Sequence, residues 1–137
     1  MTTDENFPIE SKIAPLAFEF KRLKIFEPFW SCEGHNDNSG ALWKIPRVWF
    51  YCDSVLSVRL LSDVLKDLEI EKYIAVPWLV RLTFTEDDNP GTAFSLEPEL
   101  TQNPDADLET LQGDILAIAE NLYGRMMIKA GILKAKI

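Results

Sequence analysis

The sequence has few of the side chains on which enzymes and metal sites depend. It contains one histidine, His35, and only two cysteines, Cys32 and Cys52. It also lacks a glycine-rich phosphate-binding loop, a Ser/His/Asp arrangement and a zincin helix motif. The familiar classes built on those motifs are therefore excluded, and the reactive groups gather in the short stretch around Cys32.

Long apolar runs and positive charge are scarce as well. No apolar run approaches the roughly 18 residues that indicate a membrane span, and residues 1–6 lack the basic and apolar regions of a signal peptide. A net charge of -8 repels phosphate backbones. We expect a cytoplasmic protein with reduced cysteines that binds a protein or a small molecule, without membrane or non-specific nucleic-acid binding. Its oligomeric state stays open.

Bulky apolar residues are plentiful, with four Trp, eight Phe and three Tyr to fill a core. The length of 137 residues predicts one globular domain over 1–137, in which residues 1–10 form a loose N-terminal arm. Apolar periodicity predicts helices over about 11–27, 53–68 and 105–130 and strands at 29–32, 45–52, 77–86 and 92–97. This α-β-β-α-β-β-α order indicates an α+β fold. We expect one mainly antiparallel sheet of about four strands with helices packed on a face.

The strand at 45–52 has two different faces. Val48, Phe50 and Cys52 form the expected core face, and the opposite face carries an arginine between aromatic residues. Aromatic side chains beside arginine can stack bases or bind a partner, or a helix can cover them and leave the arginine at the rim. The candidate ligand-binding residues are Gly34, Arg47, Trp49, Tyr51 and Asp53.

The Cys32-x-x-His35 turn admits three interpretations. With Cys52 it offers three zinc ligands, and Glu33, Asp37 or Asp53 would supply the fourth. Alternatively, Cys32 is a nucleophile, His35 its base and Glu33 the group that orients the histidine. In the third interpretation both cysteines are small buried hydrophobes and His35 bonds the backbone. Because Gly34 permits a tight turn, we expect Cys32 to be the more accessible thiol and Cys52 to be buried.

The motif Ser31-Cys32-Glu33-Gly34-His35, followed by the aromatic strand Val48-Trp49-Phe50, resembles a pattern in small bacterial and phage proteins. It is more distantly similar to the Ser-Cys-Ser-Gly motif of the wybutosine tRNA-modification methyltransferase family, which has arginine where this chain has His35. The resemblance implies an α/β fold with the motif at a sheet edge and a small-molecule or nucleotide pocket beside it. It implies no particular reaction.

Two function classes remain. The first is a small acidic cytoplasmic binding or interaction protein, of the inhibitor or adaptor kind. The second is a small enzyme, or a ligand- or metal-binding domain, that uses the Cys32-x-x-His35 turn with Cys52, and zinc is the one cofactor it would hold. Convergence of Cys32, His35 and Cys52 in a solvent-reachable pocket would distinguish the second class from the first.

Overall fold

The computed structural model describes residues 9–84 and 91–136. Its elements are α1 (Ala14–Leu23), β1 (Glu27–Cys32), β2 (His35–Asn36), β3 (Leu42–Lys44), β4 (Arg47–Tyr51), α2 (Val55–Ile70), β5 (Trp78–Leu82), β6 (Ala93–Pro98) and α3 (Leu108–Lys136). Within the described ranges, no helix is both long and apolar enough to cross a membrane.

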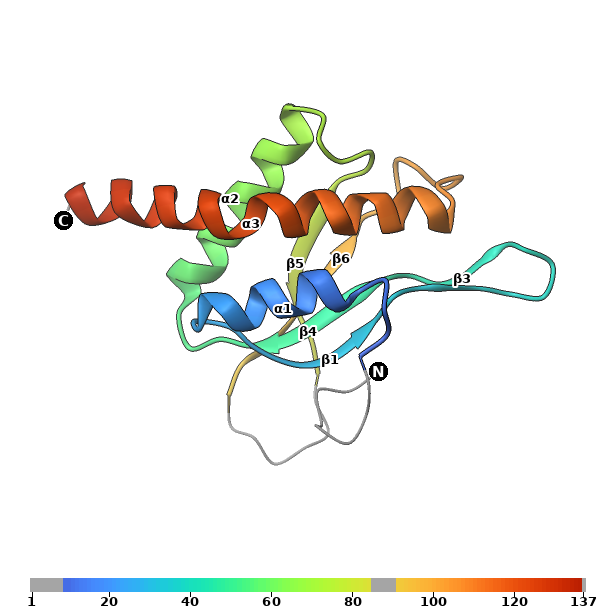
Figure 1. Ribbon diagram of the computed structural model, residues 1–137, viewed down its shortest axis with the longest axis horizontal. Coiled ribbons are helices and arrows are strands. Elements are labelled where there is room, and N and C mark those ends of the chain that lie inside the picture. Colours follow the sequence, from blue (N-terminus) through green and yellow to red (C-terminus); the bar gives the residue numbers. More distant parts are fainter. Residues whose placement is uncertain (1–8, 85–90, 137) are drawn as a thin grey trace.

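Four strands form one antiparallel sheet in the order β1-β4-β6-β5. The expected α+β fold is therefore confirmed, with one addition to the expected order. The short strands β2 and β3 form a separate hairpin, which projects from the body in Figure 1. The sequence indicated only a turn here. The hairpin forms because the Asp37 carboxylate accepts hydrogen bonds from the amides of Ser39 and Ala41 and so closes a tight loop.

The three helices share one core with one face of the sheet. Val48 and Phe50 pair with Leu96 and Phe94 across β4 and β6, so these four side chains lie on the same face. That face belongs to the apolar cluster that α1, α2 and α3 also enter. The expected stripe of α3 is confirmed, since its four members are fully buried: Leu111, Ile115, Ile118 and Leu122.

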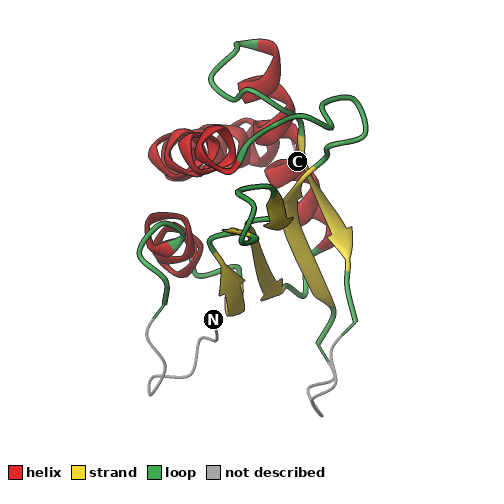
Figure 2. Ribbon diagram, turned by 90° about the vertical axis from the view of Figure 1, so that its right-hand side faces the viewer, coloured by secondary structure: helices red, strands yellow, loops and turns green. Residues whose placement is uncertain are grey.

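No helix among the described residues lies over the opposite face of the sheet. Figure 2 shows the helices to the left of the strands, above them and behind them. Side chains such as Trp49, Ser95 and Arg81 share this face, because Trp49 pairs with Ser95 and Ser95 with Arg81. The alternative in which a helix covers the face of Arg47, Trp49 and Tyr51 does not hold for the described residues, because all three of their apolar helix faces pack on the other side.

A buried carboxylate connects α3 to the start of β5. Asp114 is 4% exposed, and it accepts hydrogen bonds from the amides of Ala75 (2.8 Å) and Val76 (3.2 Å) and from Trp78 Nε1 (3.0 Å). Three donors satisfy a group whose burial would otherwise be costly. Asp114 therefore sets the position of the helix along the sheet.

Two expected boundaries moved. Strand β5 ends at Leu82, before the end of the strand expected over 77–86, and Leu82 and Phe84 are 69% and 76% exposed. Helix α3 passes the expected stop at Gly131 and continues to Lys136, because the exposed glycine is followed by helix-forming residues. Residues 85–90, where the strand at 77–86 was to end, lie outside the described residues.

Replacing Asp114 by alanine should lower the free energy of unfolding by about 3 kcal/mol or more, because three buried donors lose a charged acceptor. Urea denaturation of the wild type and the variant measures this difference. Glu120→Ala, an exposed change on the same helix, is the control and should shift stability by less than about 0.5 kcal/mol. Equal stability of the two variants would contradict the anchoring role of Asp114.

Candidate functional site around Cys32 and His35

Gly34 shapes the turn between β1 and β2. Its φ of +87° lies in the left-handed region, where side chains other than glycine are strained. A Cβ at this position would lie 2.6 Å from Leu108 Cδ1, 3.0 Å from Pro46 Cδ and 3.1 Å from the Lys44 carbonyl oxygen. The turn is thus packed beneath the first residue of α3, and only glycine fits there.

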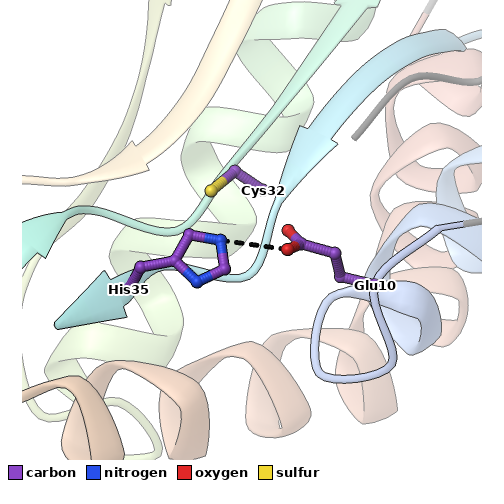
Figure 3. A group of neighbouring side chains, drawn as sticks. All are labelled: Glu10, Cys32 and His35. Atoms are coloured by element: carbon purple, nitrogen blue, oxygen red, sulfur yellow. Dashed lines mark ion pairs between the residues drawn. The ribbon is translucent and has the colours of Figure 1, made fainter.

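Glu10 is a neighbour of Cys32 and His35 that the sequence did not reveal. Its carboxylate lies 2.9 Å from His35 Nε2 through Oε2, and its Oε1 accepts the amide proton of Glu33 at 3.0 Å. One potential ligand atom from each of Glu10, Cys32 and His35 lies within 4.8 Å of the others (Figure 3). The sequence placed Glu10 in a loose arm, because no local pattern signals contacts across more than 20 residues. Residues 1–8 of that arm lie outside the described residues.

The Cys32 thiol is buried within this cluster. The residue is 2% exposed, compared with 6% for Cys52, so the expectation that Cys32 is the more accessible thiol is wrong. The turn packs under Leu108 instead of opening to solvent. Burial raises the pKa of Cys32, and the hydrogen bond from the Gly34 amide to Sγ (3.4 Å) opposes that rise in part. The free thiol is therefore protonated near neutral pH and is a poor nucleophile.

The polar groups of the turn at residues 32–34 already form hydrogen bonds within the protein. Glu33 accepts the amide proton of Lys12 at 2.9 Å through its side chain, and its carbonyl oxygen accepts Gln112 Nε2 at 3.0 Å. The amides of Glu33 and Gly34 go to Glu10 and to the Cys32 sulfur. Glu10 takes the place beside His35 that was expected for Glu33. The expected arrangement of nucleophile, base and free backbone donors is not assembled.

The structure does not bring Cys52 to this cluster. Cys32 pairs with Arg47 at one end of β4, and Cys52 follows Tyr51 at the other end, so about 16 Å of strand separates the cysteines. Both thiols are free. The zinc set of Cys32, His35 and Cys52 is therefore not formed, because one extended strand holds its members apart.

The remaining candidate zinc ligands also lie elsewhere. Asp53 is exposed and follows Cys52 at the far end of β4. Asp37 closes the hairpin turn, and hydrogen bonds from the Ser39 hydroxyl and from the amides of Ala41 and Ser39 lower its pKa. Neither carboxylate is placed to complete a site with Cys32.

Aromatic rings gather on the helix-free side of the sheet. Phe29 stacks on Tyr51 with ring centroids 4.2 Å apart, and Trp30 lies 4.4 Å from Trp49. A register shift between Pro28 and Trp30 adds a residue to β1, so that Phe29 and Trp30 both contact Trp49. We call this surface the aromatic face; its residues are Phe29, Trp30, Arg47, Trp49, Tyr51 and Arg81.

The two arginines of the aromatic face differ in their surroundings. Arg81 lies 3.4 Å from the largely buried Glu97, which also accepts a hydrogen bond from Ser95 at 2.7 Å. Arg47 lies near the Trp30 ring, with Cζ 6.0 Å from the ring centroid. Arg47 Nε and Trp49 Nε1 are buried and have no hydrogen-bond partner in the part of the chain that is described. Sequence alternation identified Arg47, Trp49 and Tyr51, whereas Phe29, Trp30 and Arg81 were missed because strand pairing alone brings them there.

Gly34→Ala should destabilise the protein by about 1–3 kcal/mol more than Gly40→Ala. Both glycines have a φ of +87°, but an added Cβ meets nothing within 4 Å at Gly40, so the pair separates steric overlap from backbone strain. Chemical denaturation of both variants provides the measurement. Equal losses would show that Gly34 is needed only for its backbone conformation.

Both thiols should react slowly with an aromatic disulfide reagent in the folded protein, because burial raises the pKa of Cys32 and of Cys52 and lowers the thiolate fraction at a given pH. The rate should rise with pH, and denaturant should make both thiols react at once. Mass spectrometry of the labelled protein identifies the residue modified. Prompt labelling of either cysteine in the native protein would contradict the burial described above.

Comparison with known proteins assigns no family to this chain. No protein-family model, curated protein or solved structure matches it. The resemblance of residues 31–35 to other proteins therefore remains an expectation, and function is inferred from the geometry of the two surfaces just described.

Proposed function

We propose that this protein is a small cytoplasmic binding protein whose aromatic face receives a segment of a partner protein. The segment carries a carboxylate next to an apolar or aromatic side chain. The supporting observation is the pair of buried N–H groups, Arg47 Nε and Trp49 Nε1, that have no acceptor in the described chain. The two free buried thiols fit a reducing compartment.

The composition of the aromatic face supports this proposal. Tryptophan, tyrosine and arginine are enriched at the centres of protein interfaces and supply most of their binding energy. Here Phe29 stacks on Tyr51 and Trp30 packs against Trp49 at a tilt, so the rings are held in place before any partner arrives. A surface ordered in advance loses little side-chain entropy on binding. The aromatic face is therefore suited to docking.

The charges indicate what kind of segment fits. Glu97 neutralises Arg81, but no carboxylate bonds Arg47 among the described residues. A buried donor without an acceptor costs about 1–3 kcal/mol, which a partner carboxylate would recover when the Arg47 side chain turns outward to meet it. The net charge of -8 opposes a single carboxylate only weakly, because screening confines charge effects to about 8 Å at physiological salt. Single-stranded nucleic acid could also stack on the rings, but its many phosphates would meet the acidic surface.

Selection from a displayed random-peptide library tests the proposal. Wild-type protein is the bait, and the enriched peptides are afterwards measured against the wild-type and the Arg47→Gln proteins. We expect the enriched peptides to carry Asp or Glu beside an apolar residue, and to bind the Arg47→Gln protein at least about tenfold more weakly, the equivalent of 1.4 kcal/mol. Titration calorimetry measures the affinities. Arg59→Gln, an exposed change on α2, is the matched control and should bind as the wild type does.

Two results would contradict the proposal. One is the enrichment of peptides that bind wild type, Arg47→Gln and Trp49→Ala equally, which would place the binding surface elsewhere. The other is tight, salt-sensitive binding of single-stranded oligonucleotides that Trp49→Ala abolishes, which would assign the face to nucleic acid. Circular dichroism of each variant confirms that it is folded.

A further inference from the structure

We propose that Glu10, Cys32 and His35 form a binding site for a zinc-type transition-metal ion, with one coordination position left open. This site is separate from the binding function proposed above and uses none of the residues of the aromatic face. It draws its ligands from the segment before α1, the end of β1 and the start of β2.

The donor set and its spacing suit such an ion. Thiolate and imidazole are ligands that select zinc, and also cobalt, over magnesium and calcium. Tetrahedral zinc, with bonds of about 2.0–2.3 Å, places its ligand atoms about 3.3–3.6 Å apart. In this protein all three ligand atoms lie within 4.8 Å of one another, and His35 Nε2 and Glu10 Oε2 are 2.9 Å apart. Shifts of roughly 1 Å, well within side-chain motion, would admit the ion.

Burial raises the pKa of the Cys32 thiol, so a metal ion has to displace the thiol proton when it binds. The Gly34 amide, which donates to Sγ at 3.4 Å, lowers this pKa, and the positive charges of Lys44 and Arg47 act on it in the same direction. Burial and the Glu10 carboxylate act in the opposite direction, and a dipositive ion at the site would outweigh both. Binding therefore releases the thiol proton to the buffer and forms a bond from the ion to sulfur.

The ligands are also held by their neighbours, as expected for a prepared metal site. The second oxygen of Glu10 accepts the Glu33 amide, and the Gly34 turn that separates Cys32 from His35 is packed against Leu108. Outer hydrogen bonds of this kind orient metal ligands and strengthen binding. An ion pair between Glu10 and His35 alone would explain their contact, but it would not explain a thiol placed beside both.

Access and ligand count indicate an open site. The side chains of His35 and Glu10 are 37% and 22% exposed, whereas Cys32 lies beneath them, so an ion can enter from the solvent side. Three protein ligands leave the fourth tetrahedral position for water or an added ligand, which is the arrangement of catalytic zinc sites and not of closed structural ones.

Titration of the chelator-treated full-length protein with Co²⁺ tests the site, because cobalt bound to a thiolate gives a sulfur-to-metal charge-transfer band. We expect one equivalent of Co²⁺ to produce this band and Zn²⁺ to displace it. Cys52→Ser, which removes the other free buried thiol, should keep the band, and Cys32→Ser should lose it. Glu10→Gln and His35→Gln should each weaken binding about tenfold or more.

Cys32 is buried, so Cys32→Ser could fail to fold, whereas Glu10 and His35 are partly exposed and can be replaced with less risk. In that case His35→Gln and Glu10→Gln, checked by circular dichroism, still report on the site. Absence of a charge-transfer band in the wild type would overturn the proposal, as would a band that disappears in Cys52→Ser. Unchanged affinity in both folded variants would show that Glu10 and His35 form only an ion pair.

Discussion

The buried carboxylate of Asp114 fixes the position of α3 relative to the sheet. The arrangement of the other elements depends on that position. This carboxylate accepts three hydrogen bonds from N–H groups at the start of β5. These bonds hold the helix at one position along the sheet. The first turns of α3 then lie over the β1–β2 turn, where Leu108 contacts the Gly34 position and Gln112 bonds the Glu33 carbonyl oxygen. A polar contact in the core thereby shapes a polar cluster at the surface.

The metal-ligand cluster and the aromatic face lie next to each other because β1 pairs with β4. Cys32 pairs directly with Arg47, so the Glu10–Cys32–His35 cluster lies at the end of the strand pair that carries the aromatic face. The positive charge of Arg47 contributes to lowering the pKa of the Cys32 thiol, although burial outweighs it.

The arrangement favours binding over covalent catalysis. The thiol is buried and protonated, the amides of its turn are already bonded, and Glu10 engages the histidine. A nucleophile needs an exposed, ionised sulfur with a base beside it. What this region offers instead is a set of donor atoms for an ion and, next to it, ordered rings with unbonded N–H groups for a partner.

The sequence by itself determined the α+β class, the apolar stripe of α3 and the core face of β4, because each follows from a repeat of 3.6 or 2 residues along a continuous segment. It also located the reactive groups in residues 32–35. Only the tertiary structure decided that Glu10 joins them, that Cys52 does not, and that none of the three described helices covers Trp49. Those outcomes depend on contacts between distant segments and on which face of the sheet the helices pack against. Local periodicity encodes neither, since an aromatic residue fits a buried face and an interface equally well.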